Sequence, residues 1–216
     1  MKKLFLIVFI LFSTSFAYSQ HLFVQTLDSV ATITFPDTPK VQTEATYRIY
    51  MTNKAGIAYL AEVSPVQPSL RDMLSKDNLD TTYNGFLKGL LESSHGKLLY
   101  KKNITIHDLD GVEFGCESIV KDQKYYTYGR VVFFNNTLIN YSVFSILPLN
   151  KTDKQLTSFF NTFKVTIAKD DVRQSGADEL AYHTGIFIGR LLAFTLLCAI
   201  IGVIVFAAIK ISRKLP

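Results

Sequence analysis

Cysteine is scarce in this chain of 216 residues, and the two that occur cannot pair with each other. Cys198 lies inside a long apolar run near the C-terminus, whereas Cys116 stands alone in the middle of the sequence. A disulfide framework is therefore excluded. No cysteine lies at the expected cleavage site after the N-terminal apolar block either, which excludes the lipid anchor of a bacterial lipoprotein.

The chain also lacks the local motifs of common catalytic and nucleotide-binding sites. It contains neither a Gly-x-Ser-x-Gly nucleophile elbow nor a glycine-rich phosphate loop. Cys116 has no histidine motif beside it to supply a base, so a small packed side chain is favoured over a nucleophile. We therefore expect a protein that is not an enzyme and that binds no cofactor.

Acidic residues are missing from both ends. All 18 lie between Asp28 and Glu179, whereas six of the 23 basic residues lie outside that region. The remaining 17 basic residues almost balance the 18 acidic ones, so the middle of the chain is nearly neutral. The formal charge of +5 thus belongs to the ends, and we expect no nucleic-acid partner.

Apolar runs, by contrast, occur at both ends and differ in kind. Residues 1–19 begin with two lysines, continue through the short apolar block Leu4–Phe12, and close on the small-x-small pattern Ala17-Tyr18-Ser19. This order is typical of a removable signal peptide, and the apolar block is too short to span a bilayer.

The C-terminal run is long enough to cross a membrane. Leu191–Ile209 contains no charged residue, and about 20 apolar residues suffice to span a bilayer. We expect a transmembrane helix over 185–209 and a short cytoplasmic tail over 210–216. Three basic residues follow the span and only Arg190 precedes it, so the positive-inside rule places the C-terminus in the cytoplasm.

These features predict a single-pass protein of a cell membrane, with the bacterial inner membrane favoured by the Met-Lys-Lys start. Residues 20–167 are expected to form one extracytoplasmic, periplasmic domain, large enough to bury its own core. The polar stretch 168–184 is expected to be a tether between this domain and the membrane.

Alternating apolar residues and turn signals predict seven strands in the domain. They are expected at Val30–Phe35, Val41–Thr52, Gly56–Val63, Leu98–Ile106, Val112–Val120, Tyr125–Phe134 and Leu138–Leu147. Turns are expected at Asn53-Lys54-Ala55, at Asp108-Leu109-Asp110-Gly111 and at Asn135-Asn136.

Two helices interrupt the strands. Apolar residues from Leu79 to Leu91 follow helical spacing, with a break expected at Asp77-Asn78 and a glycine stop at Gly96. A short helix begins near Thr152 and carries Leu156, Phe159, Phe160 and Phe163 at the same spacing. Short connections between consecutive strands predict an α+β fold, an antiparallel sheet with helices packed on it.

Four segments resemble the α/β/α sandwich shared by the PsbP protein of photosystem II and the Mog-type Ran-binding proteins. They are Ile33–Pro39, Asp110–Phe114, the hairpin Arg130–Tyr141 and the closing Phe159–Phe163. The resemblance covers roughly Val30 to Val165 and rests on turn and core residues. It implies a fold and carries over no catalytic residue, and neither photosystem binding nor Ran binding follows from it.

The expected hairpin over Tyr125–Leu147 is rich in aromatic residues on both faces, because alternate residues of a strand point to opposite sides. If helices cover both faces, these are core residues. If one face is open, the tyrosines form an interaction surface for a partner or an apolar ligand. The candidates for that surface are Tyr125, Tyr126, Tyr128 and Tyr141.

His107, Asp108 and Asp110 form the densest cluster of ionisable groups, with Glu113 and Glu117 nearby. Imidazole and carboxylates are common metal ligands, so His107, Asp108 and Asp110 are weak candidates for a metal site. The favoured interpretation is a turn without a metal, because Asp hydrogen-bonds its own backbone and Gly111 supplies permissive geometry.

Small residues recur at intervals of four in the expected span. Gly185, Gly189 and Ala193 lie at spacings that let two helices approach closely, which makes them candidates for a dimer face in the membrane. The preferred function is a non-enzymatic, membrane-anchored interaction or assembly module that binds a protein partner or a second copy. The alternative is a small apolar-ligand carrier or sensor.

Overall fold

The computed structural model describes residues 22–44, 47–65, 74–75, 79–120, 122–174, 176–177, 186 and 189–190. The expected signal peptide, the expected break at Asp77-Asn78, nearly all of the expected transmembrane helix and the tail lie outside these residues. Among the helices that the structure describes, none combines the length and the apolar character needed to cross a bilayer.

A seven-stranded sheet forms the centre of the domain, and all of its neighbouring strands run antiparallel. Its order is β3-β4-β5-β10-β9-β8-β7. The strands are β3 (Lys40–Thr43), β4 (Arg48–Lys54), β5 (Ile57–Pro65), β7 (Lys97–Ile106), β8 (Leu109–Val120), β9 (Gln123–Phe134) and β10 (Thr137–Ser145). The predicted antiparallel α+β architecture is confirmed.

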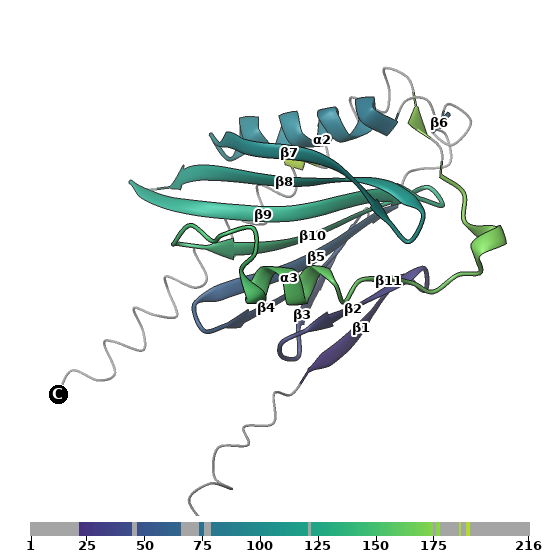
Figure 1. Cartoon of the computed structure of the whole chain (residues 1–216), viewed down its shortest axis with the longest axis horizontal. Coiled ribbons are helices and arrows are strands. Elements are labelled where there is room, and N and C mark those ends of the chain that lie inside the picture. The colour runs from purple at the N-terminus through teal and green to yellow at the C-terminus, as the bar shows by residue number, and fades with distance from the viewer. Residues whose placement is uncertain are drawn as a thin grey trace, which may run out of the picture.

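Helix α2 (Leu79–Ser93) covers one face of this sheet, above β7 and β8 in Figure 1. Its apolar stripe is buried as the helical spacing predicts, and it forms one core with residues of β8 and β9. The rings of Phe86 on α2 and Phe114 on β8 meet edge to face, 5.8 Å apart. This geometry is a favourable one for aromatic pairs.

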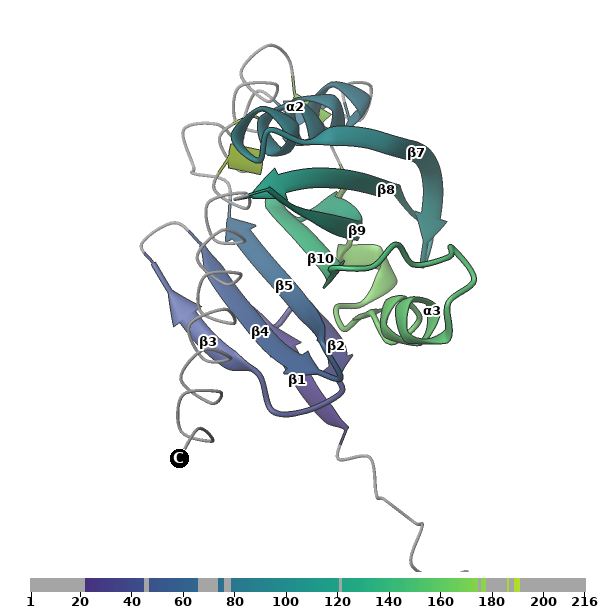
Figure 2. The same cartoon turned by 90° about the vertical axis from the view of Figure 1, so that its left-hand side faces the viewer.

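Helix α3 (Lys154–Phe160) and a small second sheet cover the opposite face (Figures 1 and 2). The small sheet has the order β1-β2-β11 and consists of β1 (Phe23–Leu27), β2 (Ala31–Phe35) and β11 (Lys164–Val165). The Asp153 side chain caps α3 by accepting a hydrogen bond from the Gln155 N–H, 2.8 Å long. Phe159 of α3 contacts rings from both sheets: Phe35, Tyr59 and Tyr141.

The tight turns fall close to the predicted positions. Asn135-Asn136 joins β9 to β10 with both φ angles positive, as its composition predicts. The turn between β7 and β8 is His107-Asp108, with φ of 50° and 67°, so it begins one residue before the predicted segment and shares only Asp108 with it. Gly111 is inside β8 instead, where an added Cβ would lie 2.9 Å from the Val131 carbonyl oxygen.

Helix α2 ends in a left-handed residue, but that residue is His95, with φ of 48°, and not the predicted Gly96. The Gly96 N–H closes the helix by donating to the Leu91 carbonyl, 2.8 Å away. Gly96 lies against β8, since an added Cβ would be 3.1 Å from the carbonyl oxygen of Glu117. Its role is close packing of α2 onto the sheet.

Three further details differ from the sequence-based expectations. Strand β1 was not predicted, and the single strand expected over Val41–Thr52 is divided into β3 and β4. The division occurs where the Glu44 N–H donates to the Tyr47 carbonyl, 3.0 Å away. The start of the expected tether is packed on the domain, because the backbones of Asn135 and Arg173 are hydrogen-bonded, 2.8 Å apart.

We expect the substitution Gly129→Ala to destabilise the domain by overpacking. An added Cβ would lie 2.5 Å from Phe114 Cζ and 2.7 Å from Ser142 Oγ, and Phe114 is itself held against Phe86. The free energy of unfolding should fall by about 1–3 kcal/mol, measured by urea titration of the full chain in detergent. Phe114→Leu in the same chain should recover part of that loss, and strict additivity of the two changes would contradict this origin.

Candidate functional site

The tyrosines expected to form an open face lie mostly in the interior. Tyr125, Tyr128 and Tyr141 are buried, and Tyr126 is partly buried against the same core. Tyr141 stacks on Phe163 with ring centroids 4.8 Å apart and an interplanar angle of 6°. The Tyr128 hydroxyl accepts a hydrogen bond from the Leu149 N–H, 2.9 Å long. The structure thus favours the core interpretation of the hairpin over an exposed tyrosine surface.

His107 and Asp108 form the turn between β7 and β8, Asp110 lies in β8, and the three side chains do not converge. The His107 ring nitrogen lies 3.0 Å from the Phe163 carbonyl, and Asp108 pairs with Lys169 at 2.6 Å. That pair is exposed, and Lys169 lowers the pKa of the Asp108 carboxyl through a hydrogen bond and its charge. The described residues contain no group of three ligands that could hold a metal ion.

Cys116 is buried in β8, within the core beneath α2. Burial raises the pKa of its thiol to about 12, so the thiol is protonated and unreactive at neutral pH. The interpretation of Cys116 as a packed side chain agrees with this position.

Of the small residues predicted to form a dimer face, only Gly189 is described. It is buried against α2 of the same chain, where an added Cβ would lie 2.6 Å from the Leu90 nitrogen. Gly89 of α2 makes the reciprocal contact with the backbone of Ile186. The next residue, Arg190, donates to Glu92 over 3.1 Å. Gly185 and Ala193 lie outside the described residues.

A half-buried ion pair joins β8 to β9 and to α3. Arg130 donates to Glu113 over 2.8 Å, and these two residues are opposite each other in the strand register. The guanidinium also lies over the ring of Phe160, 4.8 Å from its centroid. Burial raises the pKa of the Tyr141 hydroxyl, which lies in the core beside this pair. These contacts hold sheet and helix together and are structural.

A buried polar cluster was not predicted from the sequence; it lies on the same face of the large sheet as helix α2. Glu62 on β5 and Asn140 on β10 are opposite each other in register, and both are fully buried. Ser64 donates to Glu62 over 3.1 Å, and Ser142 donates to Asn140 over 2.9 Å. Glu62 Oε2 and Asn140 Nδ2 have no hydrogen-bond partner among the described residues. An acidic residue within an otherwise apolar strand is the one sequence signal that marks this cluster.

The two edges of the large sheet differ. Edge strand β7 is interrupted by a bulge between Leu98 and Tyr100 and carries Lys97, Lys101 and Lys102. Bulges and lysines protect sheet edges from pairing with other chains. Edge strand β3 has no bulge in its register with β4, and all four of its residues are exposed.

The hydrogen-bond alternation shows which groups of β3 are free. Opposite residues of two antiparallel strands alternate between hydrogen-bonded and non-hydrogen-bonded pairs. Because the Glu44 N–H donates to the Tyr47 carbonyl, Glu44–Tyr47 is a hydrogen-bonded pair, and so is Gln42–Ile49 two residues further along. The backbone N–H and C=O groups of Val41 and Thr43 therefore point away from β4. Among the described strands, β3 pairs with β4 alone, so these groups face outward at the sheet edge.

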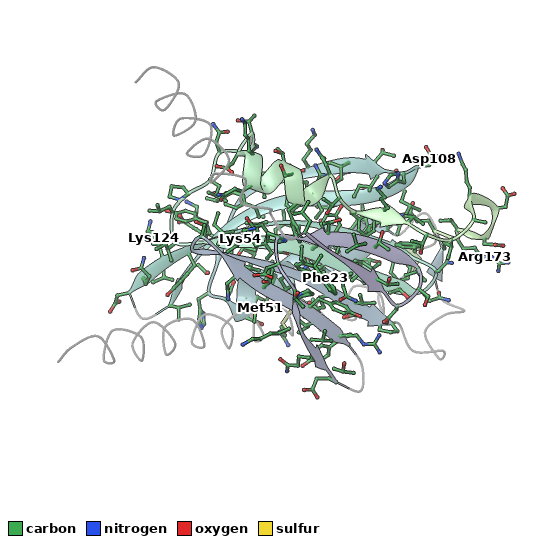
Figure 3. All side chains as sticks on the ribbon, turned by 90° about the horizontal axis from the view of Figure 1, so that it is seen from below. Phe23, Met51, Lys54, Asp108, Lys124 and Arg173 are labelled. Carbon is green, nitrogen blue, oxygen red and sulfur yellow. The ribbon has the colours of Figure 1, made fainter. Side chains whose placement is uncertain are left out.

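Exposed aliphatic side chains gather where β7 starts, β8 ends and β10 ends. We call this set the apolar end of the domain. Its members are Leu98, Leu99, Ile119, Ile146 and Leu147. Lys124, which is opposite Ile119 in register, marks this end in Figure 3, and Asp108 and Arg173 mark the opposite end.

Comparison with known proteins finds similarity among solved structures alone. No family model matches the chain, and no curated protein matches it. Cyanobacterial PsbP from Synechocystis is 10% identical with a TM-score of 0.48, over 70% of this chain and 96% of that protein. The sequence motifs and this comparison thus point to the same protein family, at a structural similarity that carries no conclusion about function.

Two proteins of Pseudomonas aeruginosa show weaker similarity. A protein of unknown function is 11% identical, with a TM-score of 0.32 over 58% of this chain and 83% of that protein. The T6SS immunity protein TplEi is 16% identical, with a TM-score of 0.35 over 65% of this chain and 47% of that protein. This chain therefore spans about half the length of the immunity protein. No function follows from these similarities.

The buried cluster predicts a distinctive pH dependence of stability. Burial raises the pKa of Glu62 from its ordinary 4.5 to about 8 in the folded protein. Between these values the folded state keeps a proton that the unfolded state loses, so stability falls as the pH rises. The slope is at most about 1.4 kcal/mol per pH unit.

We expect Glu62→Gln to remove this slope, because the amide is neutral at every pH. Unfolding of the full chain in detergent should be followed from pH 4.5 to 8.5. The free energy of unfolding of the variant, relative to that of the natural chain, should increase as the pH rises. Glu44→Gln, at an exposed position, serves as the matched control and should leave the slope unchanged. Parallel profiles for Glu62→Gln and the natural chain would refute the assignment.

Proposed function

We propose that this protein is a single-pass, membrane-anchored module that binds a protein partner on the extracytoplasmic side and catalyses no reaction. The partner adds an extended strand to the free edge of β3. The N-terminal signal pattern and the apolar run Leu191–Ile209 support the location. The observation that supports the activity is the outward-facing backbone of Val41 and Thr43.

Strand addition fits this edge for physical reasons. The outward N–H and C=O groups repeat at every second residue, which is the arrangement that a partner strand pairs with. Val41 and Thr43 are β-branched and favour the extended backbone that pairing requires. At the other edge, the bulge and lysines of β7 oppose the same reaction.

The alternative function, a carrier of a small apolar ligand, requires space between the sheet and its helices. In the described part of the chain that space holds the protein's own rings. Phe86 packs on Phe114 on one face, and Tyr141 stacks on Phe163 on the other. The interaction module is therefore the function that we retain.

The proposal is tested with a photo-crosslinking amino acid at Val41, which is 54% exposed, in the full chain in its native membrane. We expect one dominant crosslinked protein, identified by mass spectrometry. The same amino acid at the exposed Lys102, on the opposite edge, is the control and should capture far less of that protein. Capture of a second copy through Val41 would identify the partner as this chain itself.

Val41→Pro should reduce partner binding by about tenfold or more, since proline removes an outward N–H and its ring blocks the approaching strand. Proline is tolerated at an edge strand, and the β3–β4 bonds come from other residues. Binding is measured by quantitative recovery of the crosslinked partner, with Val41→Thr as the variant that keeps the N–H. Unchanged recovery in Val41→Pro would exclude strand addition at β3.

A further inference from the structure

We propose that the apolar end of the domain lies on the lipid surface of the membrane that holds the chain. This inference rests on the proposed membrane anchor and adds the orientation of the domain and a second contact with the bilayer. The partner is the lipid itself, at the boundary between headgroups and acyl chains.

The first step is the position at which the anchor starts. The uncharged run Leu191–Ile209 begins at the residue after Arg190. Arg190 pairs with Glu92 at 3.1 Å, and both side chains are about half exposed. The first residue of the apolar run is therefore covalently next to a residue that touches the last turns of α2.

The second step is the contact that keeps the anchor there. Gly189 is buried against Phe86 and Leu90, and Gly89 faces the backbone of Ile186. Any side chain larger than hydrogen at Gly89 or Gly189 would collide with backbone atoms of the other segment. This close approach, together with the Arg190–Glu92 pair, holds Arg190, the residue before the apolar run, beside the C-terminal half of α2.

The third step is the end of the domain that the anchor reaches. Glu92 lies in the last turn of α2, and Gly96 follows against the carbonyl of Glu117 on β8. Leu98 starts β7 directly after this point, and Ile119 follows Glu117 on β8. Arg190 and the apolar end therefore lie at the same end of the sheet.

The fourth step is the chemistry of the two ends. The apolar end presents aliphatic side chains that are up to 67% exposed, at Leu147, with the exposed Lys97 and the Lys124–Glu117 ion pair among them. Aliphatic side chains enter the interfacial layer of a bilayer, while lysines extend their ammonium groups to the headgroups. Ion pairs occur at both ends, but Lys169–Asp108 at the opposite end is the most exposed of them and suits water.

The chain offers a clean test, because it contains no tryptophan. Leu147→Trp places a single fluorophore at the apolar end of the full-length protein. Thr105→Trp is the matched control: it is an exposed strand position near the other end of β7, about 23 Å from Leu98 along the strand. Both variants are inserted into phosphatidylcholine nanodiscs, with and without bromine on the acyl chains.

We expect Leu147→Trp to emit at shorter wavelength in nanodiscs and to lose at least about half of its emission to brominated lipid. Thr105→Trp should remain unquenched. Ile119→Trp is a second variant with the same expected loss, so that a local effect of one substitution cannot decide the result. Far-ultraviolet circular dichroism checks that each variant is folded.

Two results would overturn the inference. Equal emission loss at Leu147→Trp and Thr105→Trp would mean that the lipid contacts neither end of the domain preferentially. No loss at Leu147→Trp or Ile119→Trp would mean that the apolar end does not contact lipid and is free or bound to a protein. Carbonate extraction of native membranes that carry the same chains separates these results from failure of the anchor. A chain released by carbonate would refute the proposed function itself, and a retained chain without quenching would refute the orientation alone.

Discussion

The rest of the structure depends on strand β10, because all nine of its residues are buried. A strand buried along its whole length needs neighbours at both edges and cover on both faces. Strands β5 and β9 are its neighbours at the two edges; α2 covers one face, and α3 with the small sheet covers the other. The ring of Tyr141 is an example of this cover, since it contacts the rings of Phe159, Phe160 and Phe163. The aromatic content of the hairpin is therefore a requirement of the fold.

The same strand carries the polar residues Asn140 and Ser142 into the opposite core. Burying Glu62 and Asn140 costs stability wherever a polar atom remains without a partner. Their facing positions also give β5 and β10 a preferred alignment, because a slip of the register would separate the two polar side chains and set each against apolar neighbours. The cluster thus lowers the stability of the fold and at the same time defines the pairing of the two central strands.

Much of the domain followed from the sequence, because periodicity and turn composition report on local structure. The strands of the β7–β10 region, the stripe of α2 and the Asn135-Asn136 turn were predicted correctly. The turn between β7 and β8 and the end of α2 were predicted incorrectly, because each was assigned to a glycine. Gly96 and Gly111 are needed where backbones approach closely, so His95 and His107 adopt the left-handed conformation nearby. Such an approach depends on tertiary contacts and is not visible in local sequence.

The candidate site was harder to infer for a related reason. Which strand lies at a sheet edge, and which backbone groups face outward there, depend on the order of the strands in space. The four residues of β3 carry no motif, and only their place at the end of the sheet makes them available. The buried Glu62 and the aliphatic end formed by distant segments likewise emerge only when the strands are assembled.

The asymmetry between the two sheet edges limits how copies of this chain are able to associate. A sheet with two open edges adds molecule after molecule and grows into a filament, because each addition exposes a new open edge. Here one edge carries a bulge and lysines, so two copies that meet through β3 leave only protected edges outside. Edge-to-edge growth ends at a two-fold symmetric pair. Crowding of such molecules therefore does not lead to fibres through this sheet.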